Sequence, residues 1–479
     1  MTQLDDASPR GGPAEGAAFD VHGIEPVPAS DRTATPLEQF WIWMGANLAP
    51  INWVLGALGI TLGLSLVDTL LTVALGNLLG CAVFGLFNVM GHRTGVNQMV
   101  LSRSAFGRRG AYVPGLAQLL LAMGWIGVNT WIVLDLVIEV LAQLGYEGGS
   151  GTRYVVAFLI MAVQLGLATW GFYAIRTFEK WTVPVTALIM VAMTVLAVVN
   201  VDVTWGGGEA QGAAKFTAVT QLMTAIGVGW GYSWLTYSSD YSRFIRPEAS
   251  ERAVFWATAA GIYVPTVWLA GLGAAVASSG TESDPSDIVV TTFGAMSLPV
   301  LLLIMHGPIA TNILNIYSSS LAALSLGIRA ARWKVTLAAG LVGSVALVLF
   351  IRSASFATAF DGWMISILVW ISPWAGIMLV DFFVLRRGRV DVAGLYADPK
   401  DSPYGDVDRG ALVALVAGLV AGWAWLFGVV PQMRGPLALA LGDTDFSWLT
   451  GTGVAGLVYW AVHRGRARRA APARAEASG

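Results

Sequence analysis

Charged residues are scarce in this sequence. They make up 12% of its residues, against roughly 25% in an ordinary soluble domain, while 56% of the residues are hydrophobic. A surface that water solvates cannot be built from so few charges. The composition therefore excludes a soluble globular domain and indicates a membrane protein.

Cysteine is almost absent, and so are the motifs of catalysis. The single cysteine, Cys81, lies within an apolar stretch, which excludes a disulfide framework and a cysteine-based metal site. The sequence has no phosphate-binding glycine loop, no HExxH zinc motif and no cluster of carboxylates or histidines suited to catalysis. We therefore expect no enzyme activity, no cofactor and no resident metal ion.

Long apolar windows fill almost the whole chain. Each is about long enough to cross roughly 30 Å of hydrocarbon as a helix. They predict an all-α polytopic membrane protein with about 12 transmembrane helices. The predicted spans cover residues 37–64, 66–91, 113–143, 154–175, 181–201, 217–239, 253–278, 296–328, 335–351, 360–385, 411–430 and 446–463.

The basic residues support this assignment because they fall on alternate sides of it. With the amino terminus in the cytoplasm, the outer loops hold only Arg153, Lys215, Arg352 and Arg434 of the 28 Lys and Arg residues. Cytoplasmic loops of membrane proteins collect such residues. We therefore expect a multi-pass protein of the cytoplasmic membrane with both termini in the cytoplasm.

The same pattern predicts one membrane domain with two polar tails. Residues 1–36 are rich in Ala, Gly, Pro and Asp and lack an apolar core, so we predict a disordered cytoplasmic tail rather than a cleaved signal peptide. Residues 37–463 form the predicted transporter domain. Residues 464–479 form a second cytoplasmic tail, whose arginines set the topology or touch anionic lipid.

Two predicted spans contain small or helix-breaking residues at their middle. The first has MGANLAP at 44–50, and the sixth has IGVGWGYSW at 226–234. An interruption inside a bilayer is costly unless it lines a cavity, where it frees carbonyls for a cation and turns helix ends toward a ligand. Paired interruptions are thus typical of a transporter. The alternative is that these glycines only allow close helix packing.

Polar side chains inside the third and sixth spans indicate a ligand site. Gln118, Trp125 and Asn129 are spaced by seven and four residues, which places them on one helical face. A flat ring beside a carboxamide suits a planar, hydrogen-bonding ligand. The sixth-span interruption adds candidates that the sequence does not rank: Trp230, Tyr232, Ser233 and Trp234.

The eighth span carries a polar stripe in apolar surroundings, formed by Thr311, Asn312, Asn315 and Ser319. Unpaired amides in hydrocarbon are expensive. These side chains therefore face a ligand or hydrogen-bond to other helices, and the pattern does not separate the two roles. His306, at the start of the stripe, is either a proton relay or a structural residue.

Two acidic residues lie at span ends beside arginines. Asp240 precedes Arg243, and Asp381 precedes Arg386. Such interfacial positions carry little cost, so we interpret both as surface or loop-anchoring pairs.

Several segments together resemble the nucleobase-cation symporter family, in its cytosine and purine permease branch. The resemblance extends over about residues 37–463. It rests on GNLLG (76–80), QMVLSRSAFGRRG (98–110), GWIGVN (124–129), SSDYSRF (238–244), ATNILNIYS (310–318) and SPWAGIMLVDFF (372–383).

The resemblance implies a five-plus-five inverted repeat of the leucine-transporter type plus two C-terminal helices. Such a protein works as a symporter by alternating access, driven by Na⁺ or H⁺. In similar permeases a base stacks between third-span and sixth-span aromatic rings while amides bond its edge. The matching residues here are Trp125, Asn129, Trp230, Asn312 and Asn315.

The resemblance also implies a cation site of first-span carbonyls and eighth-span hydroxyls, matched here by Gly45, Leu48 and Thr311. Ala310 stands where a second hydroxyl is expected, which weakens a Na⁺ site and leaves proton coupling open. Ala122 stands where some cytosine carriers have a glutamine, so the resemblance does not make cytosine the cargo.

We therefore expect a symporter that imports a nucleobase such as cytosine or a purine across the lipid bilayer. Nucleic acid and an obligate protein partner are not implied. The alternatives are another small heterocycle, such as allantoin, hydantoin or a ring-containing vitamin, and an uncoupled facilitator or channel.

Overall fold

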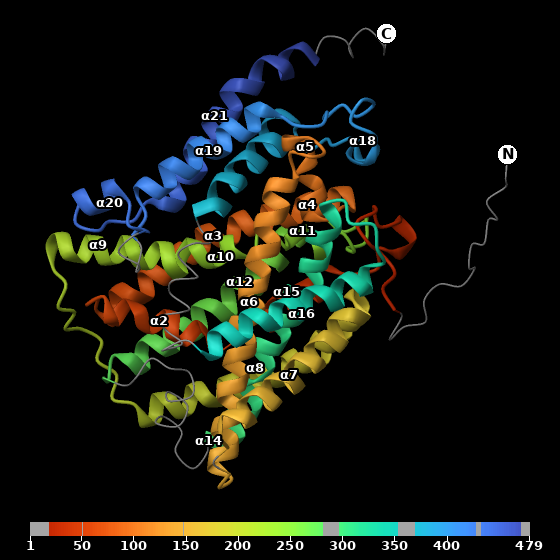
Figure 1. The fold of residues 1–479 in the computed structure, drawn as a ribbon. Coiled ribbons are helices and arrows are strands. Elements are labelled where there is room, and N and C mark those ends of the chain that lie inside the picture. Colours follow the sequence, from red (N-terminus) through yellow and green to blue (C-terminus); the bar gives the residue numbers. More distant parts are fainter. Residues whose placement is uncertain are drawn as a thin grey trace.

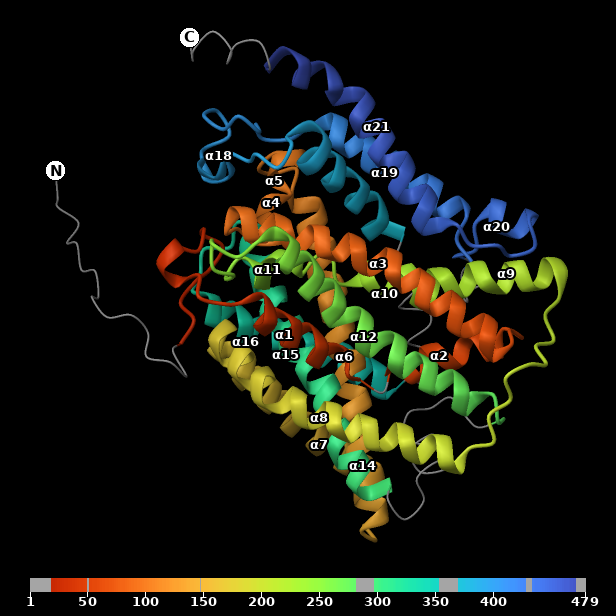
Figure 2. The same cartoon turned by 180° about the vertical axis from the view of Figure 1, so that it is seen from behind.

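The described part of the chain is built of helices, as predicted. The computed structural model describes residues 19–49, 51–146, 148–280, 297–352, 369–427 and 433–470. Within these residues, Ala34 and Ile245 form an isolated parallel β-bridge. In both views α6 runs through the middle of the molecule, and α19 and α21 lie along one edge (Figures 1 and 2).

Six described helices are long and apolar enough to cross a membrane by length and composition. They are α3 (Leu66–Thr94), α6 (Tyr112–Gln143), α7 (Ser150–Trp170), α8 (Phe172–Asn200), α12 (Glu251–Ala277) and α16 (Arg332–Ile351). The other long or apolar helices are α1 (Pro36–Asn47), α2 (Ile51–Thr61), α9 (Gly212–Leu222), α14 (Ser297–Ile304), α15 (His306–Ser325), Val369–Leu385, α19 (Arg409–Ala424) and α21 (Ser447–Ala470). The short elements are η1 (Ala29–Asp31), α4 (Gln98–Leu101), α5 (Arg103–Phe106), η2 (Met223–Gly227), α10 (Val228–Ser233), α11 (Ser238–Ser242), η4 (Val380–Leu385), α18 (Val392–Tyr396) and α20 (Pro436–Ala440).

The helices follow the predicted spans, with differences at several ends. The last helix, α21, continues to Ala470, past the predicted end at residue 463 and into the predicted C-terminal tail, and α19 ends at Ala424 rather than at residue 430. The fourth span ends at Trp170 rather than at residue 175, because Gly171 takes a φ of +96° that glycine alone adopts readily. Residues 176–180, predicted as a loop, consequently lie inside α8. The eighth span divides at Met305 into α14 and α15. The first part of the predicted tenth span lies outside the described residues.

The first span is interrupted where the sequence predicts. A capping box starts α1, since the Thr35 hydroxyl accepts from the Glu38 backbone N–H and the Glu38 carboxylate accepts from that of Thr35. The helix ends at Asn47, and α2 begins at Ile51. MGANLAP therefore contains a real break in the helix.

The sixth span is interrupted later than its glycines predict. It passes from α9 through the π-helical turn η2 into α10, which ends at Ser233 in a run of turns. A Cβ on Gly227 would lie 3.0 Å from the Cα of Gly76, and one on Gly231 would lie 2.4 Å from the carbonyl carbon of Gly80. These glycines therefore serve close packing of α10 and η2 against α3.

Residues 19–35 lie against the helices, which corrects the prediction of a free tail up to residue 36. The Asp20 N–H donates to the Trp170 carbonyl at 3.0 Å, and the Ala34 N–H donates to that of Phe244 at 3.0 Å. Asp20 and His22 are buried. The docking rests on hydrogen bonds to distant parts of the chain, which the polar composition of the segment does not reveal.

The two acidic residues at span ends are buried loop anchors and not surface pairs. An Asp240 oxygen accepts from the Gln98 backbone N–H at 3.1 Å. The Asp381 carboxylate accepts from the Ser104 hydroxyl at 2.7 Å and from Arg386 at 2.8 Å. Both carboxylates therefore hold the loop between α3 and α6, which contains α4 and α5.

Candidate functional site

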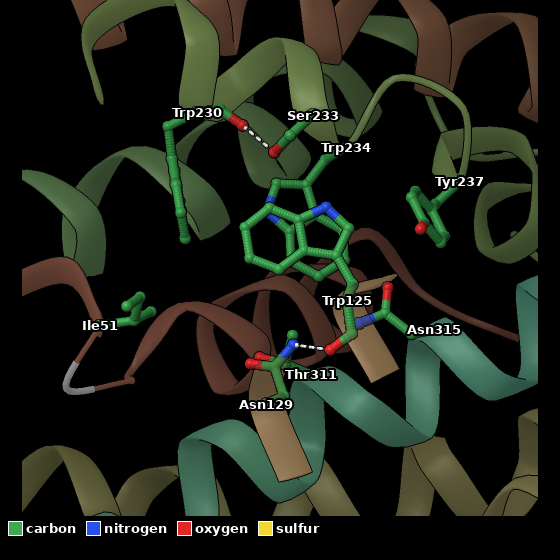
Figure 3. Close-up of a pocket in the computed structure, with 9 residues that line it drawn as sticks. All are labelled: Ile51, Trp125, Asn129, Trp230, Ser233, Trp234, Tyr237, Thr311 and Asn315. Carbon is green, nitrogen blue, oxygen red and sulfur yellow. Dashed lines mark hydrogen bonds between the residues drawn. The ribbon is translucent and has the colours of Figure 1, made fainter. Parts of the chain in front are cut away.

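A small cavity lies where the two interrupted helices meet α6 and α15. Its free volume is about 10 Å³, which is about the room that one water molecule needs, so the cavity must widen before it admits a heterocycle. The lining comes from the start of α2, from α6, from α10 with the turns after it, and from α15. The residues are Ile51, Trp125, Asn129, Trp230, Ser233, Trp234, Tyr237, Thr311 and Asn315 (Figure 3).

The two tryptophans predicted to bind the ligand meet edge to face in this cavity. The ring centroids of Trp125 and Trp230 lie 6.3 Å apart at an interplanar angle of 87°. A flat molecule between parallel rings needs about 7 Å, which is two contacts of about 3.5 Å. One ring must therefore turn before a flat ligand stacks between them.

The first interruption positions the Trp230 ring. The Trp230 Nε1–H donates to the side-chain oxygen of Asn47 at 2.7 Å, and the Asn47 amide nitrogen donates to the Trp43 carbonyl at 2.7 Å. Asn47 is the last residue of α1. The ends of the two interrupted helices are thus joined directly, through a residue that the sequence did not single out.

The amides of Asn129 and Asn315 also reach the cavity. The Asn129 side-chain nitrogen donates to the Trp125 carbonyl one turn earlier, at 2.9 Å (Figure 3). The side-chain nitrogen of Asn315 is buried, and it has no hydrogen-bond partner among the residues that the structure describes. A buried donor without an acceptor is costly, so Asn315 is ready to donate to a ligand.

Asn312 does not line the cavity, although the sequence grouped it with Asn315. Its amide nitrogen donates to the Thr130 hydroxyl at 2.7 Å and to the Gln164 side-chain oxygen at 2.9 Å. These partners lie on α6 and α7. Asn312 therefore ties α15 to two neighbouring helices.

The structure also ranks the sixth-span candidates. Ser233 and Trp234 line the cavity. Tyr232 faces the other way, because its hydroxyl bonds to that of Thr452 at 3.4 Å and its ring meets Trp448 at 6.4 Å. Tyr237 and Ile51 also line the cavity, and the sequence missed them; both lie in or beside the interruptions, and that proximity is the signal that could have found them.

The proposed cation ligands lie where α1 meets α15. The Gly45 carbonyl accepts from the Leu48 N–H at 3.3 Å, and a Cβ on Gly307 would lie 2.1 Å from the Leu48 carbonyl oxygen. The Thr311 hydroxyl donates to the carbonyl of Ala46. Backbone and hydroxyl oxygens thus gather at the first interruption, and hard cations prefer such ligands.

Long apolar helices, two of them interrupted around a buried cavity, define a polytopic membrane transporter. The solved structure of Mhp1, a nucleobase-cation-symport-1 family transporter with bromovinylhydantoin bound, is similar at a TM-score of 0.76 and 20% identity, over 94% of this chain and 97% of that one. A Na⁺-coupled sialic acid symporter is similar at 0.58 and 15% identity, over 89% and 88% of the chains. The fold is of the leucine-transporter type.

The chain belongs to the family of permeases for cytosine/purines, uracil, thiamine and allantoin, whose model matches residues 26–451. It is 24% identical to the putative purine-cytosine permease YxlA of Bacillus subtilis, over 94% of this chain and 96% of the relative. It is 25% identical to the cytosine permease of Escherichia coli K12, over 85% and 89%. The family resemblance is confirmed, and the family is one of transporters and not of enzymes.

Proposed function

We propose that this protein is a secondary active importer that carries a nucleobase, or a similar flat heterocycle, together with a cation. The observation that carries this proposal is the cavity, in which two tryptophans and the unpaired amide donor of Asn315 meet between interrupted helices. This combination offers stacking and hydrogen bonding to one flat ligand. An apolar solute would leave the buried amide donor of Asn315 unpaired.

The aromatic and amide residues have different roles in this proposal. Trp125 and Trp230 stack on the ligand, which contributes on the order of 1–3 kcal/mol per ring and accepts any flat base. Asn129 and Asn315 bond its edge. A ligand without a matching acceptor leaves the Asn315 donor unpaired, so the amides decide which heterocycle is carried.

Coupling follows from the position of the first interruption. Gly45, Leu48 and Thr311 supply the oxygens for the cation, and Asn47 in the same segment holds the Trp230 ring. A cation that orders this segment therefore also sets one wall of the ligand cavity. The two sites therefore share the segment that interrupts the first span, and this shared segment couples them.

The cargo class rests on the relatives of this chain. They include purine-cytosine, cytosine and purine-uracil permeases, and the related solved transporter holds a hydantoin. All of these ligands are flat rings with donors and acceptors at their edges. We propose cytosine or a purine as cargo, with hydantoin and allantoin as the next candidates.

Uptake of radiolabelled cytosine tests the function. The carrier is expressed in cells that lack their own base carriers, with adenine, hypoxanthine, uracil, allantoin and hydantoin as unlabelled competitors and with Na⁺ and pH gradients imposed separately. We expect accumulation driven by one gradient. Uptake that only equilibrates indicates a facilitator, and the order of competitors identifies the cargo.

The Trp125→Ala variant tests the site. Loss of one stacking ring should raise the concentration for half-maximal uptake about tenfold or more, since about 1.4 kcal/mol corresponds to tenfold. Trp256→Ala is the matched control, because Trp256 is 64% exposed on the outside of α12. Equal uptake by both variants, at equal surface expression, would contradict the site.

A further inference from the structure

Glu179 is a buried acidic side chain that the site described above does not use. It lies in α8, which packs against α1 and α15, and it is 0% exposed. Neither carboxylate oxygen has a hydrogen-bond partner among the residues that the structure describes. An uncompensated charge in a protein interior is costly. This side chain is therefore neutralised either by a proton or by a bound cation.

The basic side chains nearby do not neutralise it. Arg176 pairs with Glu38 at 3.9 Å, and Lys180 is exposed. The Nε2 of His306 lies 3.8 Å from the carboxylate but makes its hydrogen bond to the Thr182 hydroxyl, at 2.7 Å. Within the described part of the chain, the carboxylate is thus close to a histidine but not hydrogen-bonded to it.

The carboxylate reaches the first interruption directly. A Cβ on Gly45 would lie 1.9 Å from the Glu179 Oε2, so the oxygen contacts the backbone of Gly45 through space that only glycine leaves. Gly45 lies two residues before the end of α1. The Glu179 carboxylate therefore lies beside Gly45, whose carbonyl is one of the oxygens proposed above to bind a cation.

The neighbouring face of α15 lacks an oxygen ligand of its own. His306 and Ala310 are four residues apart, which places them on the same face of the helix. His306 lies 3.8 Å from the Glu179 carboxylate, and Ala310 is fully buried. Alanine at this position offers no side-chain oxygen, and the Glu179 carboxylate lies on that side of the site.

We propose that Glu179 supplies the charged oxygen ligand of a Na⁺ site at the interruption of α1. It completes a set formed by the carbonyls of Gly45 and Leu48 and the hydroxyl of Thr311. Oxygen ligands that carry one negative charge suit a hard monovalent cation, and the bound ion neutralises the carboxylate. This inference rests on the cation coupling proposed above and identifies its ion.

Thermal unfolding of the purified full-length protein in detergent tests this site without any heterocycle. The midpoint is measured against NaCl, with choline chloride holding the ionic strength constant. Na⁺ that binds the native state should raise the midpoint of the wild type in a saturable way. Glu179→Gln should lose that rise, or need about tenfold or more Na⁺ for half of it.

Three variants separate a ligand from a structural residue. Glu139→Gln removes a partly exposed carboxylate on α6 and should leave the Na⁺ response unchanged. Glu179→Asp keeps the charge and should retain a weaker response. Ala310→Ser, added to Glu179→Gln, supplies the missing oxygen and should restore part of it. Without Na⁺, Glu179→Gln should unfold no earlier than the wild type, because it buries no charge.

Two results would overturn the proposal. One is an unchanged Na⁺ response in Glu179→Gln, and the other is a wild type whose midpoint ignores Na⁺. Uptake of labelled cytosine is followed separately in the same preparations after reconstitution. A Na⁺ response that depends on Glu179, without cytosine uptake, contradicts the proposed cargo and leaves the cation site intact.

Discussion

Two asparagines on one helix show how single residues acquire different roles. Asn312 and Asn315 lie three positions apart on α15, and both are buried. Asn312 donates to Thr130 and Gln164 on neighbouring helices, whereas the Asn315 nitrogen has no partner in the described chain. The first is placed to stabilise the helix packing and the second to bind a ligand.

Alanine variants of the two asparagines should therefore separate binding from stability. Asn315→Ala should raise the half-maximal cytosine concentration about tenfold, as expected for a lost hydrogen bond of about 1.5 kcal/mol, and leave the unfolding midpoint near the wild-type value. Asn312→Ala should lower the midpoint, because it breaks contacts with two helices. Competition uptake and thermal unfolding, measured on each variant, check this. Weaker cytosine binding in Asn312→Ala together with a lower midpoint in Asn315→Ala would contradict the assignment.

The helical elements approach each other closely where glycines face glycines. Gly76 and Gly80 on α3 meet Gly227 and Gly231 of the sixth span. Backbones that touch in this way gain dispersion contacts, which is a main source of helix association in a membrane. The irregular sixth span is therefore held along one side while its other side lines the cavity.

Substitution of one packing glycine should loosen this element. Gly231→Ala places a Cβ 2.4 Å from the Gly80 backbone, so the helices must separate, at a cost of about 1–3 kcal/mol. Gly166→Ala in α7 is the matched control, because nothing lies within 4 Å of its Cβ position. We expect a lower unfolding midpoint for Gly231→Ala alone. Equal midpoints would show that this contact tolerates a methyl group.

For the molecule as a whole, residues 19–35 join parts of the chain that are far apart in sequence. The Asp20 carboxylate accepts from the His22 ring at 3.0 Å and from the Tyr317 hydroxyl at 2.9 Å, and its carbonyl accepts from Arg332 at 2.7 Å. Arg243 donates to the Gly23 carbonyl at 2.8 Å. The segment thus connects α15, α16 and the turn after α11.

Asp20 and His22 in this segment shift each other's pKa in the direction opposite to the effect of burial. Burial raises the pKa of Asp20, but the hydrogen bond from His22 and the charge of Arg332 outweigh it, so the pKa lies below its usual value. The hydrogen bond to Asp20 raises the pKa of His22 although burial opposes it, and Asp31 adds a second bond, at 3.1 Å. Only the protonated ring can donate to both carboxylates at once.

The docking of this segment should weaken as the pH rises. Because the folded-state pKa of His22 is raised, its contribution is complete below the unfolded value of about 6.5. It is lost as the pH rises through the higher folded value. In the wild type, hydrogen exchange of residues 19–35 should accelerate over that pH window by more than the intrinsic pH dependence of exchange. In His22→Gln, these residues should exchange fast at every pH. Equal profiles for the two proteins would contradict this role of His22.

Local sequence features were sufficient for the class of protein and for part of the site. Apolar windows predicted the helices, MGANLAP predicted the first interruption, and the spacing of Trp125 and Asn129 predicted a shared face; both residues line the cavity. These features succeed because hydrophobic length, helix-breaking residues and helical period act within one stretch of chain. The family segments extended the same argument to the fold.

Contacts between helices decided the rest. The sequence placed Glu179 in a short loop, yet α8 carries it against Gly45. It grouped Asn312 with Asn315, yet only Asn315 lines the cavity. A side chain's partners depend on which helix packs beside it, and helical period does not encode that choice. Composition and period therefore determined a transporter with interrupted helices, and packing determined which polar residues were left for the ligand and the cation.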